Sequence, residues 1–150
     1  MEERICVWFD EKNLSVDDAT RFVCDDLCGA ISIFIGVTRK DETETGVVKG
    51  LEFEAHPGLA TAVMKDIVME YMRQEPLVKK VYMCHRLGYV GVGETNVILA
   101  VSSGHREVSM RAVGDIMHLL KEKLPVWKKE VFENGQFVWK ANKECTLASN

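Results

Sequence analysis

The sequence predicts an α+β fold, in which antiparallel or mixed strands pack against helices as a sandwich. Apolar residues recur at three- and four-residue spacing in three segments, which is the period of an amphipathic helix. The segments between them alternate apolar and polar residues or carry short apolar runs, as strands do. Most expected strands come in adjacent pairs, giving the order β-α-β-β-α-β-β-α-β-β. This order favours an antiparallel or mixed sheet over a purely parallel one.

The first expected elements are a strand at residues 4–9 and a helix that begins after Ser15. Serine is a favoured N-cap residue, and Asp17 and Asp18 in the first turn complement the helix dipole. Gly29 is expected to end this helix. Its inward face is expected to comprise Ala19, Phe22, Val23 and Leu27.

Two strands are expected next, separated by a charged loop. The run "AISIFIGV" (30–37) is almost wholly apolar, which is typical of a central strand covered on both faces. Residues 38–46 are polar and charged, which predicts a loop. Residues 47–55 alternate and predict a second strand. We expect the two strands to form a hairpin with a long tip.

The middle of the chain predicts a helix followed by two more strands. Pro57 occupies a favoured first position for a helix, and Pro76 is expected to stop it. Residues 78–88 predict a strand, 89–94 a glycine-rich turn, and 95–103 a buried strand. The turn contains "GYVGVGE", but no Gly-Lys-Ser/Thr follows and a strand comes next, so a phosphate-binding loop is not expected.

A long helix is predicted from about His105 to Lys123. Leu124 precedes Pro125, which disfavours helical backbone at Leu124 and so ends the helix.

A hairpin is predicted after this helix, because Asn134-Gly135 lies between alternating residues and favours a type I′ turn. Counting outward from that turn predicts which side chains share a face of the hairpin. One face is expected to carry Lys128, Glu130, Phe132, Phe137 and Trp139, and the other Trp127, Lys129 and Val131.

The composition limits the classes of protein to consider. A chain of 150 residues with 47% hydrophobic residues predicts one domain, residues 1–150, with a substantial core. A net charge of −4 gives no general reason to expect a nucleic acid or membrane partner. The N-terminus lacks an apolar signal segment, and the odd number of five cysteines suits reduced thiols, so we expect a cytosolic protein. Cys24 and Cys28 are four residues apart, which fits helix packing better than a metal site.

The segment "SSGHRE" (102–107) is a candidate anion site at the start of the long helix. Ser103 or Gly104 is the expected cap, and the free backbone N–H groups beyond it attract anions. His105 and Arg106 place positive charge at the end where the helix dipole disfavours it, which a bound anion would offset. The alternative is that Arg106 pairs with a nearby acid such as Glu107, and the sequence leaves both open.

Three further cations are candidates. Arg39 follows the strand at 30–37, at a sheet edge where ligands often collect. Lys121 lies in the last turn of the long helix and Lys128 in the next strand, so the two amines can converge from different elements. Close approach near apolar walls would lower one pKa enough for proton transfer or attack. The alternative is that both lysines are ordinary surface charges.

The motifs "FIGVTR", "HRLG", "SSGHRE" and "LKEKLPVWKKE" occur in an order and spacing that resemble the catalytic (large) subunits of molybdopterin synthases, over about residues 29–144. The resemblance implies an α/β hammerhead-type fold with an additional antiparallel β-sheet. It also implies a sulfurtransferase of molybdenum cofactor biosynthesis, which converts cyclic pyranopterin monophosphate (precursor Z) to molybdopterin by building its dithiolene. No metal or other cofactor is implied.

The resemblance also implies partners. The sulfur would arrive as a thiocarboxylate on the C-terminal Gly-Gly of a small ubiquitin-like sulfur-carrier subunit. Two large subunits would form a central homodimer, with a small subunit at each end of a heterotetramer. Because the carrier supplies the sulfur, no cysteine of this chain is needed as a nucleophile.

The resemblance assigns roles to individual residues. Lys121 matches the family's essential lysine near the carrier's C-terminus, and Lys128 its second lysine. His105 and Arg106 match the pair that binds the anionic part of the substrate, and Arg39 matches the strand-end arginine.

Four more residues are site candidates. Lys129 and Glu130 lie in the same binding segment as Lys128. Met117 lies one turn before Lys121, and Lys143 occupies a position that can be arginine in the family. A non-catalytic module that binds a ubiquitin-like tail or an anionic metabolite is the alternative function.

Overall fold

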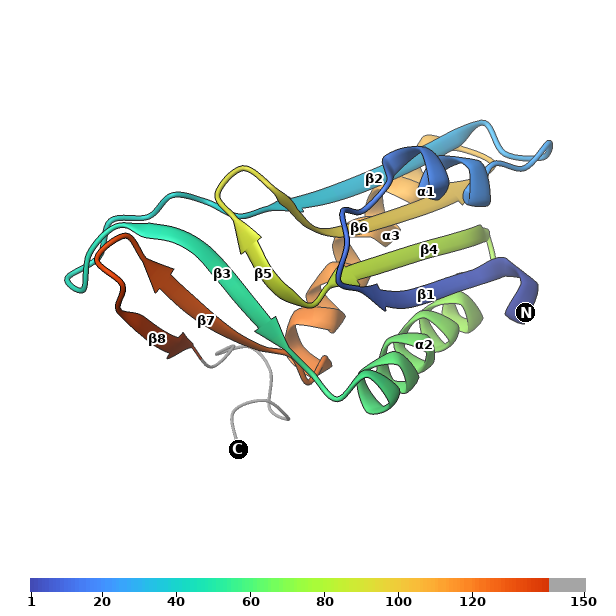
Figure 1. The fold of residues 1–150 in the computed structure, drawn as a ribbon. Coiled ribbons are helices and arrows are strands. Elements are labelled where there is room, and N and C mark those ends of the chain that lie inside the picture. The colour runs from blue at the N-terminus through green and yellow to red at the C-terminus, as the bar shows by residue number, and fades with distance from the viewer. Residues whose placement is uncertain (141–150) are drawn as a thin grey trace.

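The computed structural model describes residues 1–140, which form three α-helices and two four-stranded sheets (Figure 1). The helices are α1 (Val16–Val23), α2 (Pro57–Gln74) and α3 (Arg106–Lys123), with a short 3₁₀ turn, η1 (Glu2–Arg4), before them. The strands are β1 (Ile5–Asp10), β2 (Ala30–Val37), β3 (Val48–Glu54), β4 (Val78–Arg86), β5 (Gly88–Gly91), β6 (Thr95–Ser103), β7 (Trp127–Phe132) and β8 (Phe137–Lys140).

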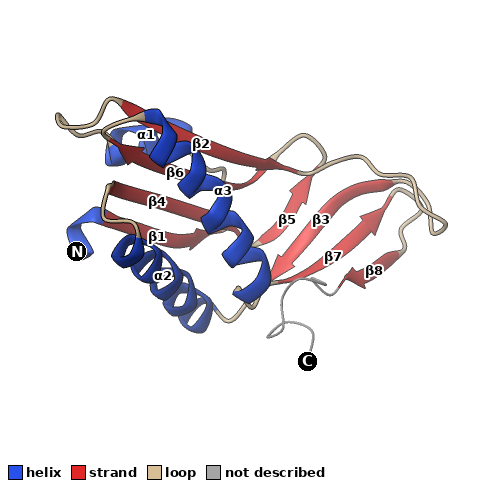
Figure 2. Cartoon of the chain, turned by 180° about the vertical axis from the view of Figure 1, so that it is seen from behind, coloured by secondary structure: helices blue, strands red, loops and turns tan. Residues whose placement is uncertain are grey.

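The first sheet has the order β1-β4-β6-β2 and carries helices on both faces. β1 is parallel to β4, whereas β6 is antiparallel to both β4 and β2. Alternate residues of β4 point to opposite faces: Val81 and Met83 pack with α2 and α3, and Tyr82 and Cys84 pack with α1. Seen from behind, α2 and α3 lie in front of this sheet (Figure 2).

The second sheet has the order β5-β3-β7-β8 and is antiparallel throughout. It lies beside the first sheet, beyond the C-terminal end of α3 (Figures 1 and 2). The two sheets and three helices confirm the predicted α+β class, with the additional antiparallel sheet.

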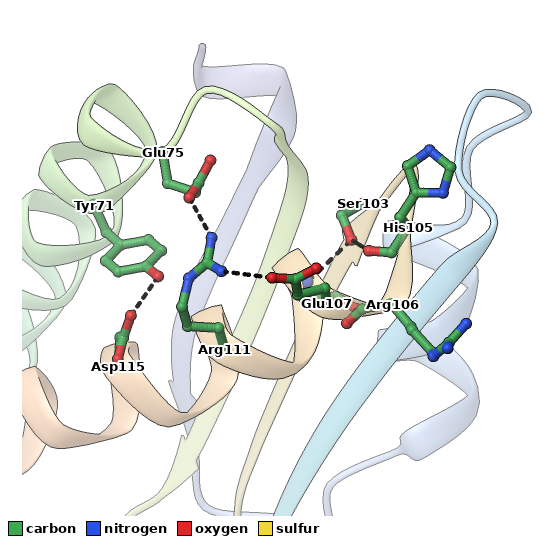
Figure 3. Close-up of polar contacts among 9 residues, drawn as sticks. Tyr71, Glu75, Ser103, His105, Arg106, Glu107, Arg111 and Asp115 are labelled. Atoms are coloured by element: carbon green, nitrogen blue, oxygen red, sulfur yellow. Dashed lines mark hydrogen bonds and ion pairs between the residues drawn. The ribbon is translucent and has the colours of Figure 1, made fainter.

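Polar contacts tie α2 to α3 on the outer side of the first sheet (Figure 3). The Tyr71 hydroxyl donates to Asp115 Oδ2 at 2.7 Å, and Arg111 Nη2 lies 2.6 Å from Glu75 Oε2. Burial raises the pKa of Tyr71 to about 12, and the hydrogen bond to Asp115 adds to that rise. The Tyr71 phenol therefore keeps its proton at physiological pH and remains a hydrogen-bond donor from α2 to Asp115 of α3.

Most predicted helix boundaries are confirmed. The backbone N–H of Asp18 donates to Ser15 Oγ at 3.1 Å, and α2 begins at Pro57 and ends before Pro76. The expected extent of the first helix is wrong, because α1 ends at Val23 and Leu27 is 77% exposed. The helix ends because Cys24 has non-helical backbone, with ψ 134°.

The expected hairpin of residues 30–37 and 47–55 is wrong. β2 pairs only with β6 within the described chain, whereas β3 pairs with β5 and β7 in the other sheet. The loop between β2 and β3 is long enough to let them separate. β2 is also an edge strand rather than a central one, and its Ile35 and Val37 are 41% and 51% exposed.

Two smaller expectations are also wrong. Residues 89–94 are not wholly a turn, because Gly88–Gly91 forms β5 on the edge of the second sheet. The N-cap of α3 is His105 rather than Ser103 or Gly104. Ser103 instead accepts a hydrogen bond from the Ser109 N–H at 3.0 Å and donates to the His105 carbonyl.

The hairpin of β7 and β8 exists, but its turn is not type I′. Asn134 does not have the positive φ that this turn requires, whereas Gly135 has φ +84°. The Gly135 N–H donates to the Phe132 carbonyl, and the Phe132 N–H donates to the Gln136 carbonyl, which gives a three-residue loop. This shifts the register by one residue, so that Lys129 faces Trp139.

The main core gives a first testable prediction. Leu99 on β6 is fully buried between the sheet and the helices α2 and α3. Leu99→Ala should lower the free energy of unfolding by about 2–5 kcal/mol, because it removes buried methyl groups and leaves a cavity. Urea denaturation measures this loss. Leu27→Ala is the matched control and should change the same quantity by less than about 0.5 kcal/mol. Equal losses in both variants would contradict the assigned core.

Candidate active site

A cavity of about 740 Å³ lies between the two sheets, beneath the C-terminal end of α3. Apolar residues of both sheets form much of its wall, including Phe34, Phe53, Met83 and Val97. Four cations and two carboxylates also line it: Arg39, Lys121, Lys128, Lys140, Asp41 and Glu130. The cations therefore exceed the carboxylates by two, which makes the cavity suitable for an anionic ligand.

Lys121 and Lys128 line this cavity from different elements. Lys121 is in the last turn of α3, which ends at Lys123. Leu124 has extended backbone and is buried, as is Pro125. The chain then enters β7, where Lys128 pairs with Phe53 of β3 and so shares its face. The proline break thus turns two lysines seven residues apart toward one space.

The environment lowers the pKa of Lys128 from the ordinary lysine value. Desolvation by the surrounding protein atoms is the largest cause, and repulsion from Lys121 is the next. Lys140 and Arg39 add to the repulsion, whereas the Glu130 carboxylate opposes it. The side chain remains accessible through the cavity. A lysine with a lowered pKa releases its proton at a lower pH than a surface lysine does.

Arg39 follows β2 and lines the cavity, in agreement with its predicted place at a sheet edge where ligands collect. Its Nε lies 2.8 Å from Asp41 Oδ1, and its side chain is 83% exposed. Met117 of α3 also lines the cavity, one turn before Lys121. Glu130 does so from β7, and its Oε1 lies 3.3 Å from Lys140 Nζ.

His85 is a cavity residue that the sequence analysis did not single out. Its Nδ1 lies 2.7 Å from the Arg86 carbonyl oxygen, which can only accept, so Nδ1 carries the proton. Burial lowers the pKa of His85 to about 4, which keeps the ring neutral at physiological pH. The only sequence feature that pointed to His85 was the "HRLG" motif, and this motif does not indicate that the side chain lines a cavity.

His105 and Arg106 do not join the cavity of the same chain. They lie at the start of α3, where Arg106 is fifteen residues before Lys121, which corresponds to about 22 Å along a helix. Arg106 points away from Glu107 (Figure 3), and the Glu107 carboxylate lies 3.9 Å from Arg111 instead. The alternative pairing of Arg106 with Glu107 is therefore not formed.

Lys129 lies on the opposite face of β7 from the cavity. Its Nζ is 3.4 Å from Glu52 Oε2, and it lies 4.6 Å from the centroid of Phe137 and 5.3 Å from that of Trp139. The aromatic surface predicted beside Lys128 thus belongs to Lys129, because of the register shift at Gly135. The substrate contact of Lys129 stays a prediction.

Lys143 lies outside the described residues. Within residues 1–140, no group of three or more His, Cys, Asp or Glu side chains is arranged to hold a metal ion. Over the same residues, no helix has the length and apolar character needed to cross a membrane.

Comparisons with known proteins agree with this architecture. The family model described as "MoaE protein" matches residues 9–123. Among curated proteins, the molybdopterin synthase catalytic subunit of Homo sapiens is 44% identical over 142 residues, which cover 95% of this chain and 74% of that protein. The subunit of the same name from Bos taurus is 42% identical over the same shares.

Solved structures have the same fold. Molybdopterin synthase from Staphylococcus aureus superposes with a TM-score of 0.83 at 26% identity, over 89% of this chain and 95% of that one. A chain from a complex of subunits 1 and 2 of molybdopterin-converting factor from Helicobacter pylori superposes with a TM-score of 0.76 at 18% identity, over 96% of each chain. The family match over most of the residues and the identity to the curated relatives together establish that this chain belongs to the MoaE protein family.

Proposed function

We propose that this chain is the catalytic subunit of a molybdopterin synthase. It would transfer sulfur from the C-terminal thiocarboxylate of a small ubiquitin-like carrier to precursor Z. The observation that carries the proposal is the convergence of Lys121, Lys128 and Arg39 on one cavity. We place the reaction in the cytosol, consistent with the free thiols of the four cysteines within residues 1–140.

The surplus of positive charge in the cavity fits both reactants. Precursor Z carries a cyclic phosphate, and the thiocarboxylate of the carrier is also anionic. In this proposal Lys121 neutralises the thiocarboxylate and stabilises the negative charge that develops during attack. The thiocarboxylate sulfur bonds to the substrate as the substrate oxygen leaves, and water then cleaves the acyl–sulfur bond, so that the carrier is left with an ordinary carboxylate and no thiol of this chain takes part.

Lys128 is the better candidate for proton transfer. Its lowered pKa makes its ammonium a stronger acid than that of an ordinary lysine, so it can protonate the oxygen that leaves the substrate. Arg39 and Glu130 would position the substrate from the two sides of the cavity. Met117 would contribute an adaptable apolar contact to the ring system.

A homodimer would bring His105 and Arg106 to the site. β2 is a free edge strand of the described sheet with exposed apolar residues, and it begins near His105 and ends near Arg39. Antiparallel pairing of β2 with β2 of a second copy would place the start of one strand beside the end of the other. His105 and Arg106 of one copy would then approach the Arg39 end of the other.

The shared site can be tested by mixing inactive variants. If His105 acts in the partner's cavity, co-expression of His105→Ala with Lys121→Ala should restore about a quarter of wild-type activity, because half of the dimers are mixed and each mixed dimer has one intact site. The matched control is Lys121→Ala with Lys128→Ala, which affect the same cavity and should not restore activity. Absence of recovery in the first mixture would contradict the shared site.

The non-catalytic alternative is separated from the proposal by intact mass spectrometry of the carrier. With precursor Z and this chain present, the carrier mass should fall by the difference between sulfur and oxygen. A pure binding module would form a complex with the carrier and leave its thiocarboxylate intact. An unchanged carrier mass after prolonged incubation would therefore overturn the proposed function.

A further inference from the structure

Lys140 is the last residue of β8 and lines the same cavity as Lys121 and Lys128. In the β7–β8 ladder it is the direct partner of Lys128, so both side chains leave the same face of the second sheet. Two lysines directly opposite each other repel, and such a pair is unfavourable unless a negative group lies between them.

Glu130 supplies part of that negative charge. It lies two residues from Lys128 on the same face of β7, which corresponds to about 7 Å along the strand. Its side chain is only 10% exposed, and its Oε1 is 3.3 Å from Lys140 Nζ, whereas the Lys140 side chain is 50% exposed. The carboxylate is thus held within the wall, whereas the Lys140 side chain, which also lines the cavity, is half exposed.

Lys140 and Glu130 act on Lys128 in opposite directions. The positive charge of Lys140 contributes to lowering the pKa of Lys128, and the negative charge of Glu130 contributes to raising it. Glu130 forms its ion pair with Lys140 and acts on Lys128 through its charge. Without Lys140, the Glu130 carboxylate would have Lys128 as its one neighbouring amine on this face of the described sheet.

We propose that Lys140 is a further ligand-binding residue of this cavity, which contacts an anionic oxygen of the ligand and holds Glu130 back from Lys128. The identity of the ligand rests on the proposed function. The binding of an anion by Lys140 does not, because it can be measured without any sulfur transfer. The chemistry recognised is a phosphate ester or a carboxylate, which correspond to the small substrate and to the carrier tail.

Binding of inorganic phosphate gives the direct test. By isothermal titration, Lys140→Ala should bind phosphate about two- to fivefold more weakly than the unaltered chain, because one partly exposed cation is lost. Lys140→Arg should bind as the unaltered chain does, because it keeps the charge. Lys123→Ala is the matched control, since this exposed lysine lies outside the cavity, and it should have no effect. Equal phosphate affinity in Lys140→Ala and the unaltered chain would overturn the binding role.

The same variants separate the two ligand sources. A rise in KM for precursor Z in Lys140→Ala, with unchanged affinity for the carrier bearing a carboxylate tail, would assign Lys140 to the phosphate. The reverse result would assign it to the carrier tail. If neither quantity changes, the proposed contact is wrong.

The effect on Lys128 has its own measurement, which needs no turnover. In protein labelled with 13C at the lysine side chains, the pKa of the Lys128 amine should be higher in Lys140→Ala than in the unaltered chain and in Lys140→Arg. Loss of a repelling charge and release of Glu130 act in the same direction. An unchanged Lys128 pKa would overturn the positioning role, and neither outcome depends on whether sulfur transfer occurs.

Discussion

Lys121→Ala is expected to lower the rate of sulfur transfer by at least about a hundredfold, the loss that follows removal of one preorganised group that stabilises developing charge. In the proposed mechanism Lys121 neutralises the thiocarboxylate and the charge that forms during attack. The loss should appear in kcat measured with saturating carrier and precursor Z. The side chain lies at the surface of α3, so the variant should unfold at the same urea concentration as the unaltered chain.

Lys123→Ala is the matched control for this experiment. Lys123 lies two residues further along the same helix, is exposed, and does not line the cavity. It should leave kcat nearly unchanged. Near-normal turnover in Lys121→Ala, or an equal loss in both variants, would remove Lys121 from the catalytic assignment.

Lys128→Ala is expected to lower kcat by about 10²–10⁴-fold, which is the usual contribution of a general acid. The unaltered enzyme should also show a characteristic pH dependence. A proton donor must be protonated, so activity falls as the pH rises through its pKa. Because the pKa of Lys128 is lowered, this fall should begin at a lower pH than it would for an ordinary lysine.

Lys128→Arg distinguishes acid catalysis from simple charge. Arginine keeps the positive charge but does not release its proton at accessible pH, so KM for precursor Z should stay close to that of the unaltered enzyme while kcat falls. Lys49→Ala, an exposed residue of β3 outside the cavity, is the control and should change neither. If Lys128→Arg retains kcat and the alkaline fall in activity, proton transfer by Lys128 is excluded.

Local sequence patterns predicted the helices well because their signals are local. Apolar spacing, the Ser15 cap, Pro57 at the start of α2 and Pro76 after its end indicate the helix boundaries, except for the C-terminal end of α1. The pairing of strands was harder to predict, since β2 and β3 are neighbours in sequence but join different sheets. An apolar run such as that of β2 is compatible with a central strand and also with an edge strand that has exposed apolar side chains. Only knowledge of which strands pair distinguishes these two positions in the sheet.

The difference between local signals and long-range strand pairing also explains which site residues were predicted. Lys121, Lys128 and Arg39 lie beside recognisable element ends, and the structure brings them to one cavity. His85 and Lys140 were missed because they reach it through long-range strand pairing. The one-residue shift at Gly135 exchanged the faces predicted for the β8 side chains relative to those of β7, because side chains alternate along a strand.

The most direct test of the central claim is a single-turnover assay with this chain, thiocarboxylated carrier and precursor Z, with molybdopterin and carrier mass measured in the same samples. The proposed function predicts that molybdopterin appears as the thiocarboxylate disappears, with two carriers consumed for each dithiolene formed. It also predicts that Lys121→Ala blocks both changes. Molybdopterin formation at an equal rate without this chain, or carrier consumption without any molybdopterin, would contradict the assignment of sulfur transfer to this cavity.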